Sequence, residues 1–305
     1  MKDTNEKIIE IQNLVKDYRS IRAVDHLSLD VFHGDVFGFL GPNGAGKSTT
    51  IRMLITLIKP TSGSVNLFGK NLLQNRNELL RKIGCIVEKP DFYNYLTGEQ
   101  NLELFVRLSG IKTDKNRIEE LLELVGLKGR GGDKVKTYSH GMKQRLGLAQ
   151  TLIHNPSLII LDEPTTGLDP KGIIDMRNLI NHLSKDKGIT VFLSSHILSE
   201  IELIATRMAI INKGKTIVQG TVKELLNTEE MVVMFNVNDV QRGLGIAKQE
   251  NLEIVSAEMN ANQFAVHLSK EQIPVLNKKL IENNIAVYSM EGKRKLEDYF
   301  LRLVN

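Results

Sequence analysis

One short segment constrains the fold of this chain more than any other. Residues 41–49 read Gly-Pro-Asn-Gly-Ala-Gly-Lys-Ser-Thr, so a glycine is followed by four residues and then by Gly-Lys-Ser. An apolar run, Val36 to Leu40, precedes the segment, and apolar residues at helical spacing follow it between Ser48 and Leu57. Strand, glycine-rich loop and helix in this order predict a loop that binds phosphate groups; an ordinary glycine-rich turn is the alternative.

The residue types within this segment suit the phosphates of a nucleotide. Backbone N–H groups between the glycines can turn toward phosphate oxygens, and the dipole of the following helix adds partial positive charge. Lys47 supplies a cation to the β and γ phosphates, and the hydroxyl of Ser48 can bind Mg²⁺. The candidate nucleotide-binding residues are Asn43, Gly44, Gly46, Lys47, Ser48 and Thr49.

Two adjacent carboxylates follow a second apolar run. Residues 158–161 read Leu-Ile-Ile-Leu and lead directly into Asp162 and Glu163. Neighbouring residues of a strand face opposite ways, so one carboxylate can bind Mg²⁺ while the next reaches the water that attacks the γ-phosphate. We assign Asp162 to the metal and Glu163 to the general base. An ordinary acidic turn at the end of a strand is the alternative.

A histidine follows a third apolar run. Thr190 to Leu193 leads into Ser194, Ser195 and His196, which places the histidine at the ligand-binding edge of the expected sheet. We expect His196 to donate a hydrogen bond to the γ-phosphate, with a purely structural histidine as the alternative.

The order of elements predicts two domains. The chain has 305 residues, which at roughly 150 residues per domain fits that number. Short strands at the start, then helices alternating with buried strands, predict an α/β domain over residues 1–220 with a mostly parallel sheet and an antiparallel part at its N-terminus. A mostly helical insert is expected at about residues 88–155. Residues 221–305 read strand, helix, strand, strand, helix, strand and a final helix, which predicts a small α+β domain.

Composition excludes several classes of protein. Cys85 is the only cysteine, so neither an intrachain disulfide nor a cysteine-rich metal site can form. The formal net charge of +4 is too small to indicate a nucleic-acid partner. Residues 1–20 lack the apolar core of a secretory signal, and no apolar run approaches the ~18 residues that span a bilayer. Any membrane role is therefore expected to come through a partner.

The phosphate loop, the Asp-Glu pair and the histidine occur in an order that resembles the nucleotide-binding domain of ATP-binding cassette (ABC) transporters, a P-loop NTPase fold. Tyr138 to Leu146, Tyr-Ser-His-Gly-Met-Lys-Gln-Arg-Leu, is similar to the family signature, and Gly167 to Pro170 is similar to its D-loop. The resemblance implies ATP and Mg²⁺ as ligands. It also implies a head-to-tail homodimer in which Ser139 and Gly141 of one subunit hold the ATP bound by the other. Tyr18 stands where the family places an adenine-stacking aromatic.

Two residues depart from the family pattern. Glu88 occupies a position where the family usually has glutamine; its carboxylate can bind Mg²⁺ but repels phosphate. His140 stands in the signature where glycine is commonest, which changes the freedom of the backbone beside the anion site. We expect Glu88 to alter hydrolysis or its coupling to transport, and we expect neither departure to abolish activity.

Residues 221–305 resemble the ferredoxin-like accessory domain of the drug and antibiotic exporter branch, which includes daunorubicin, bacitracin and sodium exporter ATPases. The resemblance implies an ATPase subunit of a bacterial exporter, bound peripherally at the cytoplasmic face of the cell membrane through a separate transmembrane permease subunit. The aromatic stretch at residues 89–98 is expected to face that permease. No direct contact with nucleic acid is expected.

Two alternatives remain open at this point. One is a soluble, non-transport cassette ATPase that acts on the ribosome or on nucleic acid, which the single cassette and the lack of a basic arm disfavour. The other is a nucleotide-gated regulatory module without hydrolysis, which Glu88 and His140 leave possible.

Overall fold

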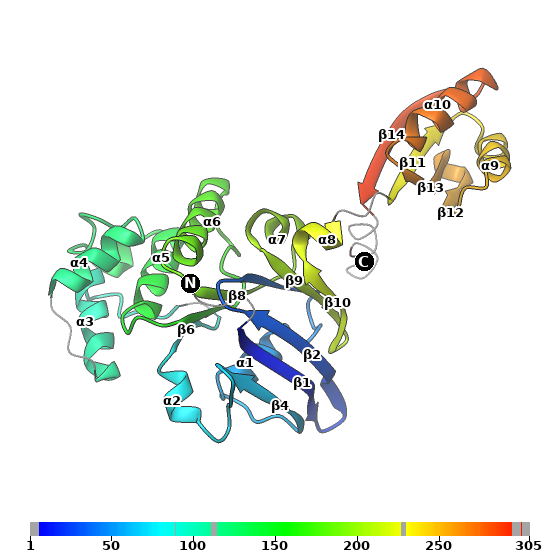
Figure 1. Cartoon of the computed structure of the whole chain (residues 1–305). Coiled ribbons are helices and arrows are strands. Elements are labelled where there is room, and N and C mark those ends of the chain that lie inside the picture. Colours follow the sequence, from blue (N-terminus) through cyan, green and yellow to red (C-terminus); the bar gives the residue numbers. More distant parts are fainter. Residues whose placement is uncertain (1–5, 89, 111–114, 227–229, 295–299, 301–305) are drawn as a thin grey trace. The chain divides into compact units, whose positions relative to one another are not determined.

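The computed structural model describes residues 6–88, 90–110, 115–226, 230–294 and 300. The chain divides into two compact units, Met1–Val222 with two sheets and Lys223–Asn305 with one, and each unit has its own core (Figure 1). Each unit is described by itself below.

A six-stranded sheet forms the centre of the first unit, in the order β10-β9-β3-β8-β7-β6. Its strands are β3 (Val36–Leu40), β6 (Ile83–Ile86), β7 (Leu158–Leu161), β8 (Thr190–Ser195), β9 (Arg207–Asn212) and β10 (Lys215–Thr221). All neighbours pair in parallel except β9 and β10. Every residue of β3, β7 and β8 is buried, which is why these strands read as continuous apolar runs rather than as alternating patterns.

An antiparallel sheet of four strands, in the order β2-β1-β4-β5, belongs to the same unit. Its strands are β1 (Lys7–Tyr18), β2 (Ile21–Phe32), β4 (Ser62–Leu67) and β5 (Lys70–Asn71). Helix α1 (Lys47–Leu54) packs Ile51 and Leu54 into a core shared with both sheets. In that core the ring of Phe192 lies 5.6 Å from that of Phe37 and 5.2 Å from that of Phe39. Alternate residues of β3 thus face α1.

Helices cover the other face and one edge of the six-stranded sheet. Helices α6 (Pro170–Lys185) and α7 (Leu198–Ile204) pack against β3 and β8, and α5 (His140–Thr151) packs against the edge strand β6 (Figure 1). Helices α3 (Gly98–Ser109) and α4 (Lys115–Leu124) pack on α5 and form the helical part of the unit. The short helices are α2 (Arg76–Leu80), α8 (Val222–Leu226) and the 3₁₀ turn Val135–Thr137.

Side-chain caps fix where α5 and α6 begin. The Ser139 hydroxyl accepts a hydrogen bond from the backbone N–H of Met142, 3.2 Å away, at the start of α5. The Asp169 carboxylate accepts one from Gly172 at 2.9 Å, and Pro170 occupies the first position of α6. The two helices that begin in the signature and D-loop segments are therefore set by local sequence.

The second unit is an antiparallel sheet with two helices. Its elements are β11 (Glu230–Val237), α9 (Val240–Gln249), β12 (Ile254–Glu258), a 3₁₀ turn (Met259–Ala261), β13 (Gln263–Ser269), α10 (Gln272–Glu282) and β14 (Val287–Arg294). The strand order β12-β13-β11-β14 is that of a ferredoxin-like βαββαβ unit. The stacked rings of Phe235 and Phe264, with centroids 5.4 Å apart, lie at the centre of its core.

The predicted fold class is confirmed, with differences at element ends. Helix α1 ends at Leu54 rather than at Leu57, because Thr56 adopts a left-handed conformation with φ of 58°. The first two strands are longer than predicted, 12 residues each, because the bulges in their pairing interrupt the apolar alternation. Strand β8 continues two residues beyond the predicted end at Leu193. The expected closing helix at residues 296–301 falls, apart from Phe300, outside the described residues.

Substitution of Gly38 tests the packing of α7 on the central strand. A Cβ atom at Gly38 would lie 2.4 Å from Cγ2 of Ile201 on α7. Because both elements are buried, we expect Gly38→Ala to lower the free energy of unfolding by about 1–3 kcal/mol, measured by urea denaturation. Gly132→Ala is the matched control, since a Cβ there meets no atom within 4 Å. Equal stability of the two variants would contradict this packing.

Candidate nucleotide-binding and catalytic site

Sheet order brings three chain segments together at one edge. Strand β8 lies between β3 and β7, and all three run parallel. The phosphate loop follows β3, Asp162 and Glu163 follow β7, and His196 follows β8. Because carboxyl ends of parallel strands share an edge of the sheet, these side chains meet although they are far apart in sequence.

The phosphate loop is held in shape by its neighbours. Gly46 precedes the first residue of α1 with φ of 104°, and a Cβ atom there would lie 2.6 Å from the carbonyl oxygen of Ala23. The carbonyl of Ala45 accepts a 2.9 Å hydrogen bond from the N–H of Gly214, in the turn between β9 and β10. A glycine is required at position 46 both for its conformation and for this close approach.

Lys47 connects the phosphate loop to the acidic strand end. Its side chain is 6% exposed. The ammonium donates to the carbonyl of Gly41 at 2.7 Å and to that of Pro42 at 3.2 Å. The same Nζ lies 3.4 Å from Oε1 of Glu163. A buried ammonium needs this many partners, because burial without them is strongly unfavourable.

Glu163 is the most heavily constrained side chain of the site. Its backbone N–H donates to the hydroxyl of Ser194 at 2.9 Å. Its Oε2 atom accepts two hydrogen bonds, one from the hydroxyl of Thr166 and one from Nδ1 of His196, each at 3.0 Å. Since a carboxylate accepts, Nδ1 of His196 carries the proton in this contact, and Nε2 is the nitrogen left to face a phosphate.

The surroundings of Glu163 favour its charged form. Burial alone raises the pKa of this carboxyl. The hydrogen bond from Thr166 and the electrostatic influence of nearby His196 and Lys47 lower the pKa by more, so it lies below the ordinary value for a glutamate. The group is thus an ionised carboxylate at neutral pH and can accept a proton.

Asp162 and Ser48 provide oxygen ligands that fit Mg²⁺. Both line a cavity of about 270 Å³ together with Glu163 and Glu88, Gln144 and Thr166. Asp162 accepts a 2.5 Å hydrogen bond from the hydroxyl of Ser194, which fixes one carboxylate oxygen. Hydroxyl and carboxylate oxygens are the donors that Mg²⁺ prefers when phosphates supply further ligands. No group of three or more His, Cys, Asp or Glu side chains in the described part of the chain, this site included, is arranged to hold a metal by itself.

Comparisons with known proteins agree on one family. A family model described as "ABC transporter" matches residues 24–166. The chain is 44% identical over 299 residues to the bacitracin transport ATP-binding protein BcrA of Bacillus licheniformis, and the match covers 97% of each protein. The chain belongs to the ATP-binding subunits of ABC transporters. It is thus an ABC ATPase subunit, and the family resemblance predicted from the sequence is confirmed.

Solved structures of this family share the fold of the first unit. The cbiO1 protein of Clostridium perfringens, described as part of the ABC transporter complex cbiONQ, matches with a TM-score of 0.67 and 25% identity, covering 74% of this chain and 92% of that one. The ATP-binding cassette MJ0796, described as a dimer in a post-hydrolysis state bound to ADP and Pi, matches with a TM-score of 0.63 and 25% identity, covering 70% and 98%. No helix among the described residues is both long and apolar enough to cross a membrane.

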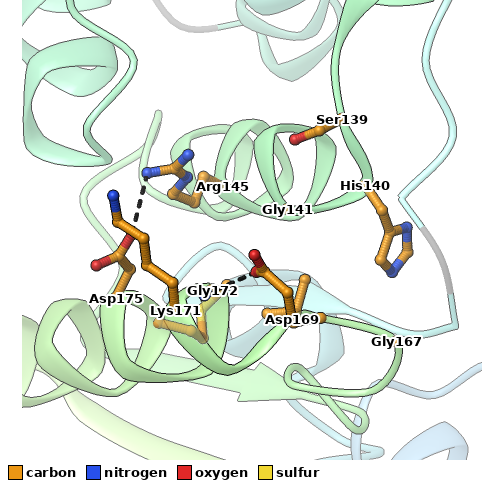
Figure 2. A pocket seen from close by; sticks show the side chains of 11 residues that line it. Ser139, His140, Gly141, Arg145, Gly167, Asp169, Lys171, Gly172 and Asp175 are labelled. Carbon is orange, nitrogen blue, oxygen red and sulfur yellow. Dashed lines mark hydrogen bonds and ion pairs between the residues drawn. The ribbon is translucent and has the colours of Figure 1, made fainter.

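The signature segment of this ABC ATPase lies in a different hollow from the phosphate loop. Ser139 and Gly141 open onto a cavity of about 450 Å³ between the starts of α5 and α6 (Figure 2). Arg145 and Lys171 line the same cavity, with Asp175 in an ion pair with Arg145 at 3.8 Å. The fold therefore gathers Lys47 and the strand-end residues in one place and the two signature residues in another.

The remaining predicted site residues stand apart from the carboxylates. Tyr18 is 41% exposed at the end of β1, with the ammonium of Lys16 5.0 Å from the centre of its ring. Asn43 and Gly44 are exposed in the loop, while Thr49 is half-buried in the first turn of α1. These positions leave the tyrosine ring and the tip of the loop open to a ligand.

Glu88 lines the same cavity as Asp162 and Ser48 but has a partner of its own. Its carboxylate forms an ion pair with the guanidinium of Arg52 on α1, at 2.5 Å. Glu88 also adopts φ of 65°. The ion pair competes with the role as a metal ligand that the sequence suggested, because one carboxylate oxygen already binds a cation.

Sequence reasoning missed three side chains of the site. Ser194 contacts both Asp162 and the backbone of Glu163, Thr166 donates to Glu163, and Gln144, 5% exposed, lines the cavity. Extending the apolar strand at residues 190–193 by its two serines would have shown Ser194 at the ligand edge. Thr166 lies in the same turn as Glu163, and Gln144 is placed by the packing of α5, for which the sequence carries no local signal.

Loss of the Ser194 hydroxyl should disturb both carboxylates. Ser194→Ala leaves the N–H of Glu163 without its acceptor and removes the donor to Asp162. We expect a fall of about 1–3 kcal/mol in the free energy of unfolding, together with slower ATP hydrolysis. Urea denaturation and steady-state phosphate release measure the two effects. Ser109→Ala, which removes an exposed hydroxyl bonded to its own helix, is the control, and indistinguishable behaviour would contradict the bridging role.

Proposed function

We propose that this ABC ATPase subunit powers export of a bacitracin-like antibiotic and that Glu163 is its general base. The assignment of Glu163 as the general base rests on one observation: its carboxylate lies between Lys47 of the phosphate loop and His196. The similarity to a bacitracin transport ATP-binding protein over 97% of both chains supports the class of cargo.

In this proposal the residues of the site have separate roles. Backbone N–H groups of the phosphate loop, including Asn43, Gly44 and Gly46, surround the phosphates of ATP, and Lys47 turns its ammonium toward the β and γ phosphates. Ser48 and Asp162 hold Mg²⁺, which when bound neutralises charge on the phosphate oxygens. Ser194 keeps Asp162 oriented toward that position.

Glu163 accepts a proton from the attacking water in this scheme. Its ionised carboxylate is held by Thr166 and His196, so its direction is fixed before the reaction begins. His196 contributes through Nε2, which donates to the γ-phosphate only when the ring carries both protons, because Nδ1–H is already directed at Glu163. The exposed ring of Tyr18 stacks on the adenine.

We further propose that two copies of the chain act as a head-to-tail homodimer. The phosphate loop and the signature residues Ser139 and Gly141 open onto separate hollows of one subunit, which supports a shared site completed by a second copy. The cassette MJ0796, described as a dimer with ADP and Pi, supports the same arrangement. N–H groups at the start of α5 then face the phosphates bound by the other subunit.

A transmembrane permease completes the exporter in our proposal. The chain attaches to it peripherally, at the cytoplasmic face of the membrane. Tyr93 and Tyr95 support a contact surface, because they are 48% and 68% exposed with their rings edge to face at 5.9 Å. The transport relatives favour this assembly over a ribosomal, nucleic-acid-binding or purely regulatory role.

Neutralising the proposed base should separate hydrolysis from binding. We expect Glu163→Gln to lower the rate of ATP hydrolysis by about 10²–10⁴-fold while ATP still binds, because the variant loses the proton acceptor and keeps the phosphate loop. Phosphate release gives the rate and calorimetry the affinity. Glu119→Gln, on the exposed face of α4, is the charge-matched control. Hydrolysis at the unmodified rate would overturn the assignment.

Affinity capture tests the transport role separately. An affinity-tagged Glu163→Gln chain, mixed with ATP and detergent-solubilised membranes of the source cells, should retain a protein with several membrane-spanning helices. Mass spectrometry identifies what is retained, with the same capture in the absence of ATP as the reference. Recovery of ribosomal proteins or nucleic acid in place of a membrane protein would support the non-transport alternative.

A further inference from the structure

We propose that His140 is a positioning residue that ties the start of the signature helix α5 to the turn carrying Glu163. Through this tie, a ligand at the signature segment changes the orientation of the carboxylate in the same subunit. The inference rests on the proposed function, in which the signature segment and Glu163 of one chain serve two different ATP molecules.

The first link is a contact between two loops. Nε2 of His140 lies 3.2 Å from the carbonyl oxygen of Thr166. A carbonyl oxygen only accepts, so Nε2 carries the proton and donates it. Figure 2 shows the ring of His140 directed toward the loop that contains Gly167. Gly167 has φ of 78°, and a Cβ atom there would lie 3.3 Å from the same Nε2. The loop that contains Thr166 and Gly167 therefore lies close to the imidazole ring of His140.

The second link joins Thr166 to the carboxylate. The hydroxyl of Thr166 donates to Oε2 of Glu163 at 3.0 Å. Its backbone N–H donates to the carbonyl of Glu163 at 3.2 Å. A shift of the Thr166 backbone therefore moves a hydrogen-bond donor of the carboxylate, and His140 holds that backbone from the other side.

The turn between these contacts depends on its neighbours. Glu163 adopts φ of 48°, a left-handed conformation that a residue with a side chain adopts only where surrounding contacts hold it. Those contacts are the Ser194 hydroxyl on its N–H and the Thr166 and His196 donors on its side chain. The turn therefore keeps this conformation only while its surrounding contacts hold it.

His140 also belongs to the helix start that forms the proposed anion site. It is the first residue of α5 and lies between Ser139 and Gly141, the two residues proposed to meet the partner-bound phosphates. A phosphate that orders this helix start also orders the residue whose ring reaches Thr166. Glycine, the commonest residue of the family here, has no side chain to make this contact, so the tie belongs to this sequence and not to the fold.

A continuous chain of contacts therefore runs from the signature segment through His140 and Thr166 to Glu163. Coupling between two binding sites acts in both directions, so the state of Glu163 also affects the signature segment. One neutral hydrogen bond limits the size of the coupling to about tenfold. His140 thus tunes hydrolysis and does not itself contact the reacting atoms.

The test uses the full-length chain and three variants. His140→Ala removes the donor, His140→Gln places an amide N–H at similar reach, and His182→Ala is a control on an exposed face of α6. We measure kcat and KM for ATP, and amide hydrogen exchange without nucleotide in peptides covering residues 162–169 and 139–148. We expect His140→Ala to lower kcat about three- to tenfold with little change in KM, and to speed exchange in residues 162–169 by a similar factor.

His140→Gln should restore both values, and His182→Ala should change neither. Three results would overturn the tie: unchanged kcat and exchange in His140→Ala, no recovery in His140→Gln, or faster exchange confined to residues 139–148, which indicates only a frayed helix. The exchange experiment needs no hydrolysis. If the unmodified chain hydrolyses no ATP, the proposed function fails, and the exchange data still decide whether His140 holds the turn.

Discussion

The buried ammonium of Lys47 is the interaction on which the site depends. It is held between the carbonyl of Gly41, at 2.7 Å, and the carboxylate of Glu163, at 3.4 Å. A charge that is 6% exposed is tolerated only with such partners, so the loop after β3 and the turn after β7 must come together. The parallel order β3-β8-β7 provides this meeting, and β8 between them adds Ser194 and His196 as the residues that orient the carboxylates.

The parallel strands that carry the site are buried on both faces, because the helices that connect them cover the sheet. Alternate residues of β3 face α1 and α7, with Phe39 on one side and Gly38 against Ile201 on the other. Close packing on both faces leaves little freedom for the strand ends, because protein interiors adjust poorly to displaced backbone. The phosphate loop itself is held from outside by the N–H of Gly214, so the loop is shaped before a ligand arrives. Such pre-organisation reduces the free energy spent on ordering the site during binding.

Sequence patterns predicted those parts of the fold that depend on local rules. The phosphate loop, the carboxylates after residues 158–161 and the elements of the ferredoxin-like unit all follow from short apolar periods and turn residues. Strand β4 was not predicted, because its partner β1 is distant in sequence, and the hairpin of β9 and β10 was missed although a short local turn joins its two strands. The contact of Arg52 with Glu88 was equally hidden, since it joins segments that only the packed sheet and helices bring together, whereas Thr166 and Glu163 lie in one local turn. Local chemistry thus indicates which groups act, and tertiary packing determines what holds them.

The two departures from the family pattern share one physical effect. Glu88 is bonded to Arg52 on α1 and His140 to the carbonyl of Thr166, so each links a loop near the nucleotide to a neighbouring segment. Both links are exposed to solvent, where an ion pair or hydrogen bond contributes only about 0–1.5 kcal/mol. Links of this size bias a loop toward one position without locking it, because the binding of a triphosphate supplies more free energy than either link. Hydrolysis in this chain is therefore compatible with both residues, and under our proposal His140 tunes how strongly the two hollows of one subunit respond to each other.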